Sequence, residues 1–121
     1  MTQKKTAPAK ALRERALALP GTWEDSPWGD SVVKVGKKIF VFLGDDKVTL
    51  KLVEAHPAAM SVPGAAPTGY GLGKAGWVTL PLANAPPLDI LCDWLEESYR
   101  LVAPKKLIKE LDATLNREDS R

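Results

Sequence analysis

The segment from 70 to 78 carries a glycine pattern that binds phosphate groups in some other proteins. Gly71, Gly73 and Gly76 spell G-x-G-x-x-G, and Val78 extends the pattern to that of a kinase glycine loop. A dinucleotide-binding loop follows a strand and opens a helix, whereas here an irregular stretch precedes the glycines and a strand-like run follows them. A kinase also needs H-R-D and D-F-G motifs, which the sequence lacks. The pattern therefore does not predict a nucleotide site.

Few other residues have the types and spacing of a catalytic or metal site. His56 is the only histidine and Cys92 the only cysteine, and these two cannot make a zinc site by themselves. Cys92 lies on the apolar stripe of an expected helix, which favours a buried small hydrophobe, and His56 has no visible nucleophile as a partner. The acidic pairs at 24–25 and 45–46 fall in expected turns, where such residues bond their own backbone. We therefore expect a protein that is not an enzyme and that holds no metal or cofactor.

Aromatic residues beside basic ones are more informative. Tyr70, Lys74 and Trp77 are close in the sequence. Aromatic rings can stack on nucleobases and lysines can bind phosphates, so this combination is typical of nucleic-acid contacts. The alternative for Trp77 is a place in the core, and the sequence does not decide between the two.

Length and composition limit the class of protein. The chain has 121 residues, 45% of them hydrophobic and 26% charged, which predicts one globular domain over 1–121 with a core of about 8–115 and frayed ends. No apolar run approaches the roughly 18 residues of a membrane-spanning helix, so we expect no membrane contact. A single cysteine fits a reducing compartment, and the cytoplasm is the expected location. The net charge of +2 is too small to indicate nucleic-acid binding by itself.

Hydrophobic periodicity predicts the elements that must position these residues. The first half reads as a helix, a short strand and then an antiparallel meander with a tight turn at Gly36, whose alternating strands have one solvated face. The second half reads as a short helix, an irregular loop, a last strand that ends or lies at an edge near Pro81, and two helices. Together they predict an α+β domain. The expected ranges are helix 8–19, strands 23–28, 31–35, 38–43 and 48–52, helix 54–60, loop 62–76, strand 77–82, and helices starting near 86 and 104 with a frayed tail over 117–121.

Read together, these segments resemble the MmcQ/YjbR family over roughly residues 10–110. The strongest parts are the L-P-G-x-x-E opening at 19–24, the K-V-G-K-K hairpin, and the S-Y-x-L-V run at 98–102. The resemblance implies a CyaY-like α+β fold with an N-terminal helix, a β-meander and two C-terminal helices, the helices packing on one face of an antiparallel sheet. The matching stretches are ALPGTWEDSPWG, VVKVGKKIFVFL, VTLKL, PTGYGLGKAGWVTLPL and LCDWLEESYRLVAPKKL.

Members of this family are commonly labelled DNA-binding, from a proposed double-wing use of the fold. The resemblance thus implies a non-enzymatic domain that binds DNA or has a regulatory role, and DNA is the expected partner. Carried across by position, the nucleic-acid-binding residues would be four lysines of the strands and hairpin and three residues of the loop: Lys34, Lys37, Lys38, Lys51, Tyr70, Lys74 and Trp77.

The chain departs from the family at the glycines. Family members often read Y-H-x-N-K-x-H-W where this sequence reads Y-G-L-G-K-A-G-W, so three polar positions have become glycine. Glycine frees the backbone to adopt positive φ or to approach another group closely. The alternative hypothesis is therefore a small-ligand or protein-interaction module with a pocket at this loop. Its pocket would be formed by Trp28, Tyr70, Gly71, Gly73, Gly76 and Trp77.

Overall fold

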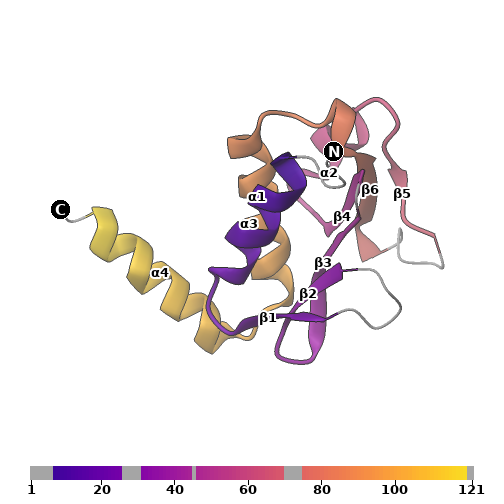
Figure 1. The fold of residues 1–121 in the computed structure, drawn as a ribbon. Helices are drawn as coiled ribbons and strands as arrows, with labels where there is room; N and C mark the ends of the chain where they lie inside the picture. The colour runs from indigo at the N-terminus through magenta and orange to yellow at the C-terminus, as the bar shows by residue number, and fades with distance from the viewer. Residues whose placement is uncertain (1–6, 26–30, 45, 70–74, 120–121) are drawn as a thin grey trace, which may run out of the picture.

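The computed structural model describes residues 7–25, 31–44, 46–69 and 75–119. Its helices and strands follow the expected order of helix, strands and helices (Figure 1). None of the helices in the described ranges is long and apolar enough to span a membrane. The elements are α1 (Ala7–Leu17), β1 (Thr22–Asp25), β2 (Ser31–Val35), β3 (Lys38–Leu43), β4 (Lys47–Lys51), α2 (His56–Met60), β5 (Ala66–Pro67), β6 (Trp77–Pro81), the 3-10 helix η2 (Leu82–Asn84), α3 (Leu88–Val102) and α4 (Lys105–Asp119).

The strands form one antiparallel sheet in the order β1-β2-β3-β4-β6-β5. The first four strands are neighbours in both sequence and space, which is the arrangement of an antiparallel meander. Gly36 adopts a φ of 63° in the turn between β2 and β3, a conformation that glycine reaches without a steric penalty. The expected antiparallel meander and the α+β class are confirmed.

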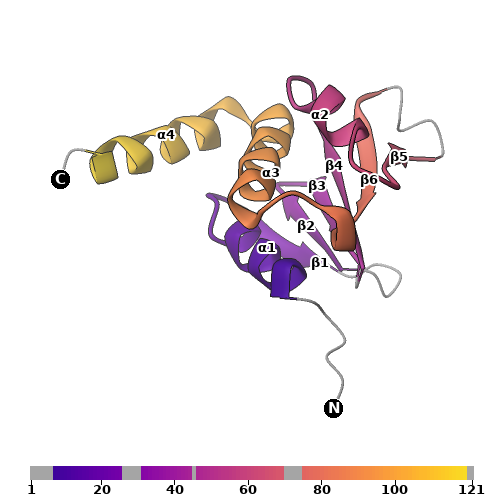
Figure 2. The ribbon, with the colours of Figure 1, turned by 90° about the horizontal axis from the view of Figure 1, so that it is seen from above.

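The helices lie on one face of the sheet (Figures 1 and 2). α1 packs on β1, β2 and α3, α3 packs on β3 and β4, and α2 packs on β6. The core forms between these helices and the inward-facing side chains of the strands. Its largest fully buried side chains are Tyr99, Phe40, Leu12, Leu50, Leu52, Leu80, Leu91 and Leu95.

A bulge in β3 sets how α3 docks on the sheet. Val33 pairs with Val41 and Lys34 pairs with Ile39, so Phe40 is the extra residue between these pairs. Both Phe40 and Val41 are consequently buried, although they are adjacent in a strand.

The bulged residue meets the C-terminal half of α3. The Phe40 ring meets Tyr99 edge to face, with ring centroids 5.4 Å apart. The Ser98 hydroxyl donates to the Phe40 carbonyl at 2.5 Å and accepts the Lys51 N–H at 3.0 Å. The last pair of the ladder between β3 and β4 is Val41 with Leu50, so Phe40 and Lys51 would be the next pair. Ser98 therefore bridges two backbone groups that would form the next pair of the ladder.

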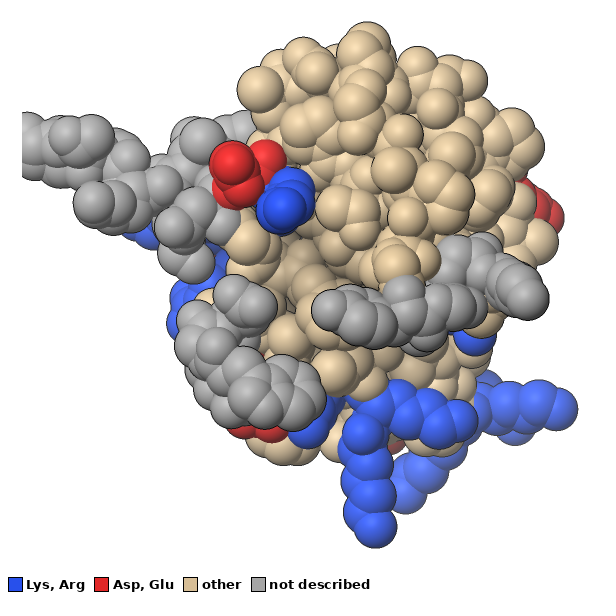
Figure 3. Space-filling view, turned by 90° about the vertical axis from the view of Figure 1, so that its right-hand side faces the viewer, with Lys and Arg blue, Asp and Glu red and all other residues tan. Residues whose placement is uncertain are grey.

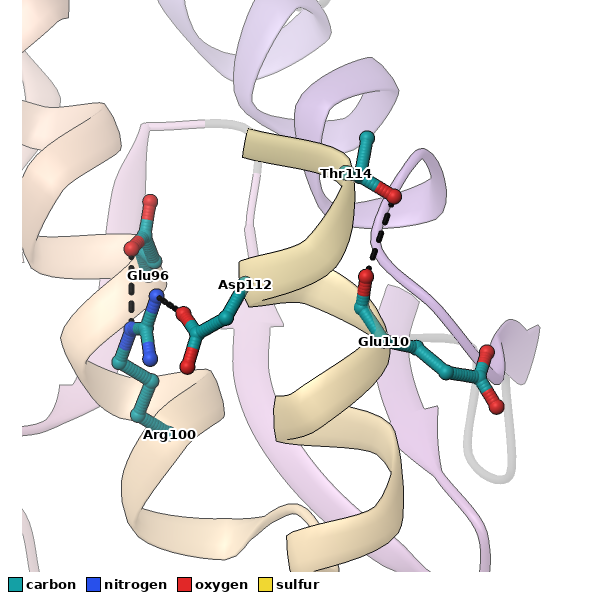
Figure 4. A network of polar contacts seen from close by, with 5 residues as sticks. All are labelled: Glu96, Arg100, Glu110, Asp112 and Thr114. Carbon is teal, nitrogen blue, oxygen red and sulfur yellow. Dashed lines mark hydrogen bonds and ion pairs between the residues drawn. The ribbon is translucent and has the colours of Figure 1, made fainter. Parts of the chain in front are cut away.

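α4 extends away from the sheet and is attached through its first half (Figures 1 and 2). Leu111 is buried in the core cluster. Arg100 of α3 donates to Asp112 of α4 at 2.7 Å and to Glu96 of its own helix at 2.9 Å (Figure 4). The hydrogen bond to Asp112, assisted by that to Glu96, raises the pKa of Arg100 above its usual value, so this link stays charged.

Several details differ from the sequence-based expectation. Residues 66–67, expected in a loop, form the short strand β5 on β6, so β6 is an inner strand and Pro81 ends it. The helical part of the tail reaches Asp119, beyond the expected start of fraying at 117. On α3, Trp94 is buried, whereas Cys92 is half-buried and Leu88 is exposed. The expectation that Cys92 is a buried small hydrophobe is thus met only in part.

Candidate functional site

The centre of the helix-free sheet face is built from aromatic rings and hydroxyl groups. Phe42 and Trp77 meet edge to face across it, with ring centroids 5.6 Å apart. Trp77 is only 9% exposed, so most of its ring is engaged in packing. Beside the rings, the Thr79 hydroxyl lies 2.8 Å from that of Thr49 and 3.0 Å from that of Thr68, so polar groups here bond one another.

The four predicted lysines lie at one end of the sheet, which we call the hairpin end because Gly36 turns the chain there. Lys37 and Lys38 occupy the turn and the first position of β3, and both are exposed. Lys34 and Lys51 lie close to this end of β2 and β4 and are half-buried. The register of the antiparallel strands thus brings together residues that are up to 17 positions apart in the sequence.

Lys34 differs from the other three lysines because its charge is already paired. Its Nζ lies 2.9 Å from a carboxylate oxygen of Asp25 and 5.1 Å from the centroid of the Trp23 ring. The ammonium group therefore combines an ion pair with a cation–π contact, and its side chain is 21% exposed. Lys37 and Lys38 are the lysines of this end that face solvent.

Trp23 is a site residue that the sequence did not single out. It lies on β1, opposite Lys34, and is 45% exposed. Its indole N–H donates to the Gly36 carbonyl at 2.9 Å, which fixes the ring against the turn. The alternation in Thr22–Asp25 does place Trp23 and Asp25 on one face. However, only the pairing of β1 with β2 reveals that this face meets Lys34.

Close packing explains why the last position of the glycine pattern, residue 76, is a glycine. Gly76 adopts a φ of 100°, and a Cβ at this position would lie 2.6 Å from the Leu52 carbonyl oxygen. The absent side chain makes room for the end of β4. Of the other predicted residues of the loop and of the alternative pocket, five lie outside the described residues: Trp28, Tyr70, Gly71, Gly73 and Lys74.

Acidic side chains gather elsewhere. A surface depression of about 540 Å³ lies between α3 and the segment before α2, lined by Val53, Glu54, Asp93, Glu96, Glu97, Arg100 and Leu101. None of the predicted site residues lines it. Within the described ranges, no group of three or more His, Cys, Asp or Glu side chains is arranged to hold a metal ion.

Comparison with known proteins assigns the chain to a family. The family model described as YjbR matches residues 17–101, which run from the end of α1 to the last turn of α3. The chain belongs to the YjbR family. All of the predicted site residues of this YjbR domain lie within the matched range, whereas α4 follows it.

A solved structure resembles the YjbR chain over most of its length. The crystal structure of Deinococcus radiodurans protein DR2400, whose family-model domain is DUF419, superposes with a TM-score of 0.63 at 28% sequence identity. The match covers 92% of this chain and 91% of that one, so it includes residues beyond those matched by the family model. No curated protein matches the chain.

Proposed function

We propose that this YjbR domain is a non-enzymatic nucleic-acid-binding protein that contacts DNA with the hairpin end of its sheet. The observation that carries the proposal is the exposure of Lys37 and Lys38 on a turn that Trp23 braces. Exposed lysines on a fixed turn suit the phosphate backbone, because phosphate contacts need positive charge and position but no particular base. A regulatory role would follow from such binding, and the lone half-buried Cys92 supports a cytoplasmic location.

The distribution of charge supports this orientation. Figure 3 views the side of the molecule away from α1 and α3, where Lys and Arg side chains gather along the lower border and most of the other described surface is uncharged. The lower border corresponds to the end where the β2–β3 turn lies in Figure 1. The acidic residues of α3 line the depression beside α2 instead. A net charge of only +2 is thus distributed so that one end of the sheet can attract a polyanion.

Charge reversal at the hairpin end tests the proposal. The double substitution Lys37→Glu and Lys38→Glu is expected to abolish binding to duplex and single-stranded DNA at low salt, whatever the base sequence. The matched control is Lys10→Glu with Lys47→Glu, which makes the same change in net charge. Both control lysines are exposed, Lys10 on α1 and Lys47 at the other end of β4.

Fluorescence anisotropy with labelled oligonucleotides, repeated at several salt concentrations, gives the affinity and its salt slope. The control variant should weaken binding only slightly, and the affinity of the unaltered protein should fall steeply as salt rises. If neither form of DNA binds at low salt, the proposal is wrong. If both double variants lose affinity equally, net charge rather than the hairpin end accounts for the binding.

The alternative, a pocket for a small molecule or a protein segment at the glycine loop, has less support. Two of its six predicted residues are described, Gly76 and Trp77. Gly76 is packed against the Leu52 carbonyl and Trp77 against Phe42, so both are engaged in internal contacts. A ligand-library thermal-shift screen that yields a salt-insensitive stabiliser would favour this alternative.

A further inference from the structure

Trp23 combines three properties that an internal packing role does not require together. Its ring is held in one orientation by the bond from its indole N–H to Gly36, and it lies beside the Lys34 ammonium. The residue is nevertheless 45% exposed, more than Trp77 or Trp94. β1 is the outermost strand of the sheet, so no strand of the described residues lies beyond it.

A fixed, exposed indole beside solvent-facing lysines has the composition of a stacking platform for an unpaired base. Every nucleobase offers a flat face, and lysines flanking the ring can bind the phosphates on either side of the stacked nucleotide. The ring loses little conformational entropy on binding, because the hydrogen bond from its N–H already holds it in place. Lys37 and Lys38 follow directly after the residue to which the ring is bonded, so base and phosphate contacts would be adjacent.

We propose that the hairpin end binds single-stranded nucleic acid, with one base stacked on Trp23 and the adjoining phosphates on Lys37 and Lys38. This inference rests on the proposed nucleic-acid-binding function and adds to it the form of the nucleic acid and the residue that selects it. A base in a duplex is stacked between its neighbours and is not free to cover the indole. Single strands should therefore bind more tightly than duplexes of the same length.

Two substitutions of Trp23 separate stacking from bracing of the turn. Trp23→Phe keeps an aromatic face but removes the N–H bond to Gly36, whereas Trp23→Leu removes both. The probes are a short oligothymidylate and a duplex of equal length, with circular dichroism and thermal melting to verify that each variant is folded. Trp23→Leu is expected to lower affinity for oligothymidylate about tenfold or more while changing duplex affinity little, because loss of base stacking acts on unpaired bases. Trp23→Phe should retain most of the single-strand affinity.

Tryptophan fluorescence gives a direct readout that does not depend on the leucine variant folding. Stacking of thymine on Trp23 should quench the emission of the unaltered protein, and this quenching should be absent in Trp23→Phe, which keeps the other three tryptophans. Retention of the full quenching in Trp23→Phe overturns the inference.

Binding outcomes decide the rest. Equal losses of affinity in both variants, for both probes, would mean that Trp23 only braces the turn. A preference of the unaltered protein for duplex over single strands would likewise overturn the inference. In both cases the proposed function stands. Failure of the unaltered protein to bind either probe removes the proposed function and this inference together.

Discussion

Gly76 and Leu52 approach each other so closely that only glycine fits at position 76. The Leu52 N–H donates to the Gly76 carbonyl at 2.9 Å, and a Cβ on Gly76 would lie 2.6 Å from the Leu52 carbonyl oxygen. The contact joins the residue after β4 to the residue before β6, where the two strands pair at Lys51 and Trp77. A glycine that resembles part of a phosphate loop in the sequence thus has a structural role in the sheet.

Substitution of this glycine should be costly. Gly76→Ala combines a strained positive φ with a collision against backbone, and should lower the free energy of unfolding by roughly 2–4 kcal/mol. Gly69→Ala is the matched control, since a Cβ there meets nothing within 4 Å. It should change stability by no more than about 1 kcal/mol. Urea unfolding of both variants measures the difference, and equal stabilities would show that the backbone near Leu52 can yield.

The hydroxyl of Ser98 should matter more than that of an exposed serine. Ser98→Ala leaves the Lys51 N–H and the Phe40 carbonyl without their shared partner in a buried position. The expected loss is about 1–3 kcal/mol, the range for an unsatisfied buried polar group. Ser61→Ala removes an exposed hydroxyl bonded to the Pro57 carbonyl and should change stability by less than about 0.5 kcal/mol. Similar values for the two variants would mean that the β3–β4 ladder closes without the bridge.

The carboxylate of Glu97 anchors the segment that precedes α2. The N-cap residue of α2 is Ala55, which has no side-chain acceptor, and the backbone N–H groups of Val53, Glu54 and Ala55 donate to Glu97. Glu97→Ala should destabilise the protein by about 1 kcal/mol and increase amide hydrogen exchange at Val53, Glu54 and Ala55. Asp93→Ala, an exposed position one turn earlier on α3, is the control and should leave these amides protected. Unchanged exchange in both variants would contradict this anchoring role.

Tyr99 should make stability depend on alkaline pH. Burial is the main cause that raises the pKa of Tyr99 above 10.0, with the charge of Glu110 acting in the same direction. The unfolded chain therefore loses this proton at a lower pH than the folded chain, so the contribution is complete below about pH 10 and is lost as the pH rises through the folded-state pKa.

Tyr99→Phe provides the comparison for this titration. The substitution removes the hydroxyl that donates to the Pro20 carbonyl at 2.6 Å, so the unaltered protein should be the more stable by about 1 kcal/mol at neutral pH. The difference should shrink above about pH 10, because only the unaltered protein has this group to ionise. Lysine titration is common to both proteins and cancels. Urea unfolding at several pH values measures the difference, and a constant gap would contradict the raised pKa.

The parts of the fold that could be predicted from the sequence depend on local patterns. The hairpin around Gly36, the meander and the two C-terminal helices follow from alternation, turn residues and proline positions within short windows. β5 could not be predicted, because a two-residue strand has no period and forms only through its pairing with β6.

The candidate site could likewise be predicted only in part. The lysines were predicted from the resemblance to the family, and the register of the strands brings them to one end. The engagement of Lys34 by Asp25 and Trp23, and the exposure of that indole, depend on which strand lies beside β2. Likewise, the carboxylate that holds the segment before α2 belongs to Glu97, more than 40 positions away, so no local pattern could reveal it.

The two borders of the sheet also bear on how the protein behaves at high concentration. β1 is four residues long and carries Glu24 and Asp25, and β5 is two residues long and includes Pro67, which has no N–H to offer a neighbouring strand. Short, charged or proline-containing borders are how natural sheets avoid joining edge to edge. The sheet is therefore protected against growth into fibrils from either side, although its inner strands are rich in valine, leucine and phenylalanine.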